Sequence, residues 1–208
     1  MSKVFFQTGI SLDGFMAGEN RGPQNPIGDD GPKIHEWMYN QRAFLKIQQM
    51  EGGAENNPDN SIIENGFENV GSFIMGKRMF EEGELHWPED LYKTDVYVLT
   101  HEIRKPWIQK GSTTFYFIND GIISALTKAR ESAKGKDTRI MGGADTIQQF
   151  INAGLIDRFV VHIAPIFLGK GIRLLDNIDK SKISVQITDV INSPSVTHVL
   201  YSVTNKKV

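Results

Sequence analysis

The stretch Thr138-Arg139-Ile140-Met141-Gly142-Gly143-Ala144-Asp145-Thr146 decides the fold class of this chain. Its first residues form an apolar run typical of a strand, and Ile147, Phe150 and Ile151 then follow at helical spacing. Consecutive glycines let a backbone approach a bulky anion, and the start of the next helix offers free N–H groups and a positive dipole end. The turn therefore predicts a phosphate site, with pyrophosphate as the usual ligand, or else only a tight strand-to-helix connection.

The same alternation of strand and helix extends outward from this turn. Apolar runs predict strands over residues 4–7, 72–75, 96–99, 114–118, 138–141 and 159–164, and a closing hairpin of residues 184–190 and 196–204. Helical spacing predicts helices over residues 34–50, from a cap at Asp59 or Ser61 to Val70, from Gly76 to Phe80, and from a cap at Asn119 or Asp120 to Ala133. Such alternation predicts an α/β domain with a mostly parallel sheet, which the hairpin makes mixed. No linker divides the chain, so we expect one domain over residues 1–208.

The composition excludes several classes of protein. The chain has 208 residues and no cysteine, so disulfides, zinc–thiolate sites, iron–sulfur clusters and cysteine nucleophiles are impossible. A formal net charge of −2 argues against a general nucleic-acid or anionic-membrane binder. The most apolar run, residues 159–168, is far shorter than the roughly 20 residues of a membrane helix. No targeting segment and no histidine pair at metal-binding spacing is visible, so we expect a cytoplasmic protein without a bound metal.

A second strand-to-helix turn carries Gly76-Lys77-Arg78. Two adjacent cations at the start of a helix oppose the helix dipole, so they suit a site that receives an anion such as a nucleotide phosphate. The alternative is a solvated surface pair. Ligands of open α/β sheets bind at the carboxyl ends of the strands, where both turns lie. Since a dinucleotide has several phosphates, two such turns in one domain favour a dinucleotide site.

Weaker signals lie in the loops and in the histidines. Ser11-Leu12-Asp13-Gly14 and Gly169-Lys170-Gly171 each follow a predicted strand, and each is either an ordinary turn or part of a substrate site. Residues 18–32 are rich in glycine, proline and asparagine, which predicts a long loop, and Gly154 is expected at the left-handed end of a helix. His162 and His198 fall in strand patterns and are expected to be structural.

In this order, the motifs resemble those of the dihydrofolate reductase-like superfamily. The chain is most similar to the riboflavin-biosynthesis reductases, the RibD C-terminal domain type, and to stand-alone "dihydrofolate reductase family" proteins. The resemblance rests on residues 11–17 (SLDGFMA), 74–80 (IMGKRMF), 98–101 (VLTH), 140–144 (IMGGA), 154–157 (GLID) and 164–169 (APIFLG). These motifs span nearly the whole chain.

The resemblance implies a three-layer dihydrofolate reductase-like fold with NADPH as the cofactor. By analogy, Lys77, Arg78, Thr100 and His101 would meet the adenosine 2′-phosphate, and Gly76 and Met79 would help to hold the phosphates. The pyrophosphate would lie on Gly142, Gly143, Ala144, Asp145 and Thr146, and the nicotinamide against Thr8, Met16 and Ala17. Because the cofactor carries the hydride, the protein would orient the reactants and exclude water.

The substrate and the proton donor are less well defined. Asp13 and Glu36 are candidate proton donors, and Asp13, Trp37, Gly169 and Gly171 are candidate substrate contacts. An acidic residue commonly precedes the glycine pair in the riboflavin-type reductases, but Met141 stands here. We expect a reductase of a C=N or C=O bond in a small heterocycle, most like 5-amino-6-(5-phosphoribosylamino)uracil reductase. The alternatives are a dihydrofolate or pterin reductase and an NADP-binding module without turnover. The resemblance also implies a homodimer.

Overall fold

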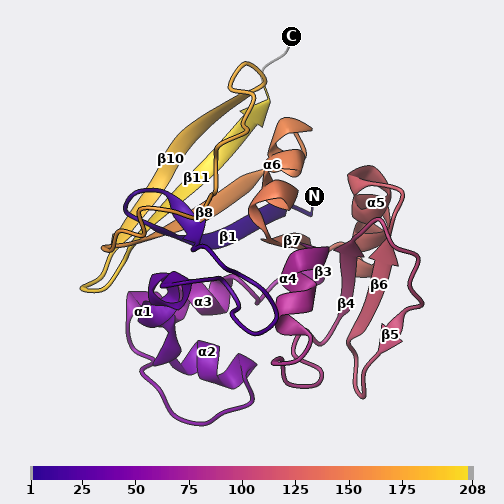
Figure 1. The fold of residues 1–208 in the computed structure, drawn as a ribbon, viewed down its shortest axis with the longest axis horizontal. Coiled ribbons are helices and arrows are strands. Elements are labelled where there is room, and N and C mark those ends of the chain that lie inside the picture. Colours follow the sequence, from indigo (N-terminus) through magenta and orange to yellow (C-terminus); the bar gives the residue numbers. More distant parts are fainter. Residues whose placement is uncertain (1, 206–208) are drawn as a thin grey trace.

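The protein is built on a nine-stranded sheet in the order β10-β11-β8-β1-β7-β3-β4-β6-β5 (Figure 1). The computed structural model describes residues 2–205. The strands of this sheet are β1 (Val4–Ser11), β3 (Val70–Gly76), β4 (Asp95–Leu99), β5 (Trp107–Ile108), β6 (Thr114–Ile118), β7 (Asp137–Gly142), β8 (Arg158–Ala164), β10 (Ile183–Asn192) and β11 (Thr197–Asn205). All pairs from β8 across to β6 are parallel, whereas β5, β11 and β10 pair antiparallel. The predicted mixed, mostly parallel sheet with a C-terminal hairpin is confirmed.

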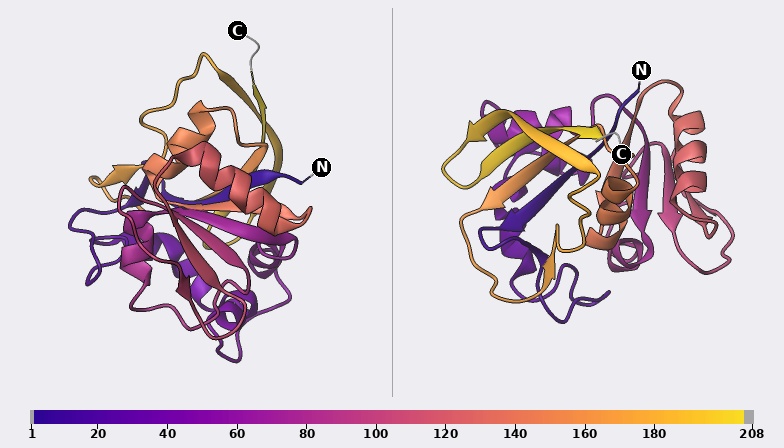
Figure 2. Two further views of the ribbon diagram at one scale, coloured as in Figure 1. Left: turned by 90° about the vertical axis from the view of Figure 1, so that its right-hand side faces the viewer. Right: turned by 90° about the horizontal axis from the view of Figure 1, so that it is seen from above.

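Helices cover both faces of the sheet and make it the middle of three layers (Figures 1 and 2). Ile74 of β3 packs in one cluster with residues of α5 (Ile122–Ala133) and α6 (Ala144–Asn152). Its neighbours Phe73 and Met75 point to the opposite face, where they join Phe80 of α4 (Lys77–Gly83). That opposite face also carries α1 (Glu36–Tyr39), α2 (Arg42–Ile47) and α3 (Pro58–Asn65), which pack onto β8.

The parallel strands all end at the same edge of the sheet. Their last residues are Ser11, Gly76, Leu99, Ile118, Gly142 and Ala164. Near Ser11, the short strands β2 (Phe15–Ala17) and β9 (Ile172–Arg173) form a separate two-stranded ribbon. These short strands and β5 are not visible as patterns in the sequence. The carboxyl edge is where open α/β sheets bind their ligands.

The prediction of one helix over residues 34–50 is wrong. A 3₁₀ helix, η1 (Gly31–His35), starts inside the predicted loop and is followed by the separate helices α1 and α2. The break occurs because residue 54 pairs with the backbone at residues 40–42. Arg42 N donates to Ala54 O at 2.9 Å, and Ala54 N donates to Asn40 O at 2.8 Å. These bonds replace the hydrogen bonds of a continuous helix.

Two predicted helix caps are also wrong. The cap of α3 is Asn57, whose Oδ1 accepts from Asn60 N at 2.9 Å, with a proline in the first turn, rather than Asp59 or Ser61. The helix stops at Asn65, so Val70 belongs to β3. The cap position of α5 is held by Gly121, at φ 97°, rather than by Asn119 or Asp120. Gly154, at φ 68°, has the predicted left-handed conformation.

Within residues 2–205, the helices are all too short or too polar to cross a lipid bilayer.

Candidate functional site

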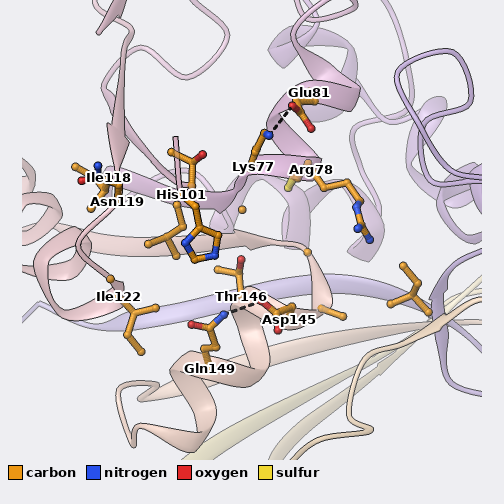
Figure 3. Close-up of a pocket in the computed structure, with 18 of the residues that line it drawn as sticks. Lys77, Arg78, Glu81, His101, Ile118, Asn119, Ile122, Asp145, Thr146 and Gln149 are labelled. Atoms are coloured by element: carbon orange, nitrogen blue, oxygen red, sulfur yellow. Dashed lines mark hydrogen bonds and ion pairs between the residues drawn. The ribbon is translucent and has the colours of Figure 1, made fainter. Parts of the chain in front are cut away.

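A cavity of about 550 Å³ lies at the carboxyl edge of the sheet, where α4, α5 and α6 begin (Figure 3). We call it the helix-start cavity. Most of the predicted cofactor residues line it, namely Gly76, Lys77, Arg78, Met79, Thr100, His101, Gly143, Ala144, Asp145 and Thr146. Figure 3 shows His101 on one wall of the cavity and Asp145 and Thr146 on the wall opposite. The structure therefore brings together motifs that are up to about 70 residues apart in the sequence.

Both glycine turns depend on glycine, Gly76 because of a close contact and Gly142 because of its positive φ. A Cβ on Gly76 would lie only 2.6 Å from Oγ1 of Thr146, so glycine is needed for β3 to meet the start of α6. Gly142 has φ 138°, a conformation that favours glycine, and its peptide bond to Gly143 is cis. The first hydrogen bond of α6 joins Ile147 N to Gly143 O at 3.1 Å. Since the first amides of a helix have no partner within it, those of α6 are available to an anion in this cavity.

The two adjacent cations of α4 differ in their environment. Nζ of Lys77 lies 2.5 Å from a carboxylate oxygen of Glu102 and 3.4 Å from one of Glu81. The hydrogen bond to Glu102 raises the pKa of Lys77. Arg78 is exposed and lines the cavity, and it makes no ion pair with any residue of the described part of the chain. Arg78 is therefore the cation that is available to an incoming phosphate.

A second cavity, of about 400 Å³, lies on the α1–α3 side of β1, β7 and β8. We call it the sheet-face cavity. Its walls include Thr8, Met16 and Ala17, which were predicted at the nicotinamide, and Trp37, a predicted substrate contact. Gly142, which was predicted at the pyrophosphate, also lines this cavity. The two cavities share the lining residues Arg21, Met79 and Gly143, so they adjoin at the glycine pair.

Arg21 connects the long loop to α4 at this junction. Its Nε lies 2.7 Å from Oε1 of Glu82 and its Nη2 lies 3.0 Å from Oε2, which is a two-point ion pair. Glu82 is only 5% exposed and also accepts from Ile27 N at 3.2 Å. The pair thus holds residues 21–27 against α4, beside both cavities.

Most of the polar groups in the sheet-face cavity were not predicted as site residues from the sequence. Gln7, His35, Arg139 and His162 all line it. Nδ1 of His162 lies 2.7 Å from Nδ1 of His198, whose Nε2 lies 3.0 Å from Oδ1 of Asp59. Burial lowers the pKa of His162 well below its usual value, and it lowers that of His35 to about 4. Both histidines are therefore neutral at pH 7. Two features of the sequence could have indicated these groups. They are the charged Arg139 within a predicted strand and the polar His162 within the most apolar run.

Asp13 and its neighbours lie outside both cavities. The Asp13 carboxylate accepts from Oγ of Ser11 at 2.5 Å and from the amides of Leu168 and Gly169 at 3.1 and 2.8 Å. The Ser11 hydroxyl is the main reason that the pKa of Asp13 falls to about 2. This carboxylate is ionised at neutral pH and fastens the turn after β1 to the loop after β8.

The structure also places three other predicted substrate or catalytic residues away from the walls of both cavities. Glu36 is exposed at the start of α1. Gly169 and Gly171 lie in the loop before β9, where a side chain on Gly171 would collide with the carbonyl of Ala17. Gly171 thus allows that loop to approach β2 closely.

The strand order, the two glycine turns and the adjoining cavities define a dihydrofolate reductase-like α/β protein. The RibD C-terminal domain family matches residues 2–199, so the chain belongs to this family.

Solved structures share the fold across the whole chain. A putative riboflavin biosynthesis protein from Shewanella sp. PV-4 is 20% identical, with a TM-score of 0.66 and 99% of each chain covered. Dihydrofolate reductase from Enterococcus faecalis, solved with NADP(H) and RAB-propyl, is 12% identical, with a TM-score of 0.56, covering 99% of this chain and 97% of that one. Among curated proteins, the uncharacterized protein YyaP of Bacillus subtilis (strain 168) is 36% identical over 86 residues. That match covers 41% of this chain and 45% of YyaP.

Proposed function

We propose that the protein is an NADPH-dependent reductase that transfers hydride to a C=N or C=O bond of a small heterocyclic substrate. The observation that carries the proposal is the junction of the two cavities at Gly143. A dinucleotide bound along the helix-start cavity would have its nicotinamide end next to the sheet-face cavity. The cofactor supplies the hydride, and the protein has to orient the two reactants and exclude water.

The residues present fit a dinucleotide phosphate. The open amides at the start of α6, beside the Gly142-Gly143 turn, suit the pyrophosphate. Arg78 supplies an uncommitted cation for the adenosine 2′-phosphate, and Thr100 and His101 line the same cavity. Thr8, Met16 and Ala17 would lie against the nicotinamide.

The substrate in this proposal occupies the sheet-face cavity. Met141 lines that cavity at the position where riboflavin-type reductases commonly have an acid. Aminopyrimidine reduction, as in 5-amino-6-(5-phosphoribosylamino)uracil reductase, and pterin reduction therefore remain alternatives within the same reaction class. Asp13 and Glu36 lie outside the cavity walls, so the proton that accompanies the hydride would come from water or from a group within the cavity.

The test is titration with NADPH, followed by the fluorescence of its nicotinamide, with NADH as the matched cofactor. We expect saturable NADPH binding below about 100 µM, within the usual range of KM values, and weaker binding of NADH. No binding of NADPH at that concentration contradicts the proposal. Binding without oxidation across a panel of pteridines, aminopyrimidines and carbonyl compounds would favour an NADP-binding module without turnover.

We also propose that the protein is a homodimer. The edge strand β10 leaves Val185, Ile187 and Val190 exposed, and an exposed apolar edge strand readily pairs with another chain. Light scattering at micromolar concentration would give twice the chain mass of 23.4 kDa if the proposal is correct, and the mass of a single chain if it is not.

A further inference from the structure

Arg139 is a buried cation without a counter-charge. It lies on β7 at 7% exposure and lines the sheet-face cavity. In the described part of the chain it forms no ion pair, and its Nε has no hydrogen-bond partner. Burial lowers the pKa of Arg139 to about 10, so the side chain is still charged at pH 7.

The contacts that Arg139 does make are too weak to balance its burial. Nη1 donates to Gly66 O at 2.9 Å, and the guanidinium carbon lies 4.5 Å from the centre of the Phe67 ring. Together, one hydrogen bond and one cation–π contact return less free energy than the removal of an ion from water costs. An unpaired buried charge of this kind is expected where a ligand supplies the opposite charge.

The other titratable groups of the cavity leave this charge uncompensated. Arg21 and Glu82 neutralise each other through their two-point ion pair. His35 and His162 are neutral because burial lowers their pKa values, and burial raises the pKa of Tyr39. Glu82 is the only carboxylate among the cavity's described lining residues. The wall therefore carries a single positive charge, on Arg139.

The rest of the wall defines the shape of the ligand. Many of its side chains are aromatic or thioether groups, including Trp37, Phe44, Phe67, Trp87 and Met141. Nε1 of Trp37 is a buried donor without a partner in the described chain, so a second group in this wall lacks an acceptor. Apolar walls with a few polar groups are typical of sites for flat organic molecules.

We propose that the sheet-face cavity binds a flat aromatic or heteroaromatic monocarboxylate, with its carboxylate held by the charge of Arg139. A monoanion matches the single positive charge, whereas a phosphate dianion would leave one negative charge unbalanced in an apolar cavity. Arg139 precedes Gly142 by three strand residues, which is about 10 Å along β7. The carboxylate and the reducible bond would thus lie at opposite ends of the ligand. This last point rests on the proposed reductase function, but the binding preference does not.

Calorimetric titration with a matched set of probes tests the proposal on the wild-type protein. The probes are 2-naphthoate, the neutral 2-naphthamide and the dianion 2-naphthyl phosphate. We expect naphthoate to bind at least about tenfold more tightly than either of the others, as expected for one charge-assisted contact. Equal binding of naphthoate and naphthamide, or tightest binding of the phosphate, would overturn the proposal. This comparison needs no variant to fold.

Variants then assign the preference to Arg139. Arg139→Met should abolish the preference for naphthoate and leave naphthamide binding within about twofold, while Arg139→Lys should retain part of the preference. The matched control is Arg158→Met on β8, which is separated from β7 by β1. Arg158 also lies over a ring, that of Phe5, but it is paired with Asp137 and lies outside the cavity. A preference that survives in Arg139→Met, or is lost equally in the control, contradicts the proposal.

A measurement of stability separates this role from a structural one. Because Arg139→Met removes an unpaired buried charge, the unfolding free energy of the unliganded protein should stay constant or rise. A large loss of stability with an unchanged ligand preference would mean that Arg139 only supports the fold. Each titration is done with and without NADPH. A naphthoate preference without NADPH binding would refute the proposed reductase function and leave this inference intact. NADPH binding without a naphthoate preference would overturn this inference and leave the proposed reductase function intact.

Discussion

The two cavities differ in how their walls are made. The helix-start cavity is built from short motifs, each a strand end followed directly by a helix, and its polar groups are backbone amides and exposed side chains. The sheet-face cavity is built from side chains on strand faces, from η1 and the helices after it, and from the long loop. Several of its polar groups, among them Gln7, Arg139 and His162, are buried. The walls of the helix-start cavity follow from short turn motifs in the sequence. The walls of the sheet-face cavity form only when distant segments of the chain fold together.

The largest effect is expected where the two cavities join. Arg21→Ala leaves Glu82 buried without its partner and frees the long loop from α4, so we expect a loss of about 3 kcal/mol in unfolding free energy. Urea denaturation measures it. Arg42→Ala is the control, since its partner Glu55 is exposed, and it should cost less than about 1 kcal/mol. Equal losses in the two variants would show that the Arg21–Glu82 pair contributes no more to stability than an exposed ion pair does.

The glycine turn of the helix-start cavity is the next feature to test. In Gly76→Ala the new methyl group would meet the Thr146 hydroxyl, so β3 and α6 must separate. We expect NADPH binding to weaken on the order of tenfold to a hundredfold. Gly22→Ala, at a position with open space around it, should bind NADPH as the wild type does. Unchanged binding in Gly76→Ala would place the cofactor elsewhere.

A smaller effect distinguishes the two cations of the helix-start cavity. Arg78→Ala should weaken NADPH about tenfold and leave NADH unchanged, because only NADPH has the 2′-phosphate. Lys77→Ala should change the affinity by about twofold or less, because Glu81 and Glu102 already neutralise this lysine. Fluorescence titration of each variant with NADPH and with NADH gives four affinities, each to be compared with that of the wild type. A larger effect from Lys77 than from Arg78 would reverse the assignment.

At neutral pH the smallest effect concerns the sheet-face cavity, because it develops only as the pH falls below about 6.5. The pKa of His35 is lowered from 6.5 to about 4 by burial, so below pH 6.5 the unfolded chain takes up a proton before the folded protein does. Stability should therefore fall as the pH falls from about 6.5 to about 4, with no further loss from this group below that. His35→Gln should show a shallower fall in urea denaturation across this range. An identical slope in the two proteins would contradict burial of a neutral His35.

The sequence allowed prediction of the sheet and of the helix-start cavity because both depend on local patterns. The apolar runs correspond to the parallel strands, and Gly76 and Gly142 mark the turns that meet in the cavity. The break between α1 and α2 was not predictable, because it comes from backbone pairing with Ala54. The sheet-face cavity was missed for a similar reason. Arg139 and His162 are single polar residues within apolar strands, and only the fold shows that they face one cavity.

We propose that one dinucleotide lies along the helix-start cavity and presents its nicotinamide to the sheet-face cavity. A crystal structure of the protein with bound NADP⁺ tests this most directly. We expect the 2′-phosphate within hydrogen-bond distance of Arg78, the pyrophosphate at the start of α6, and the nicotinamide beside Gly142 and Met16. A nicotinamide that lies away from the glycine pair, or a cofactor bound outside the helix-start cavity, would contradict it.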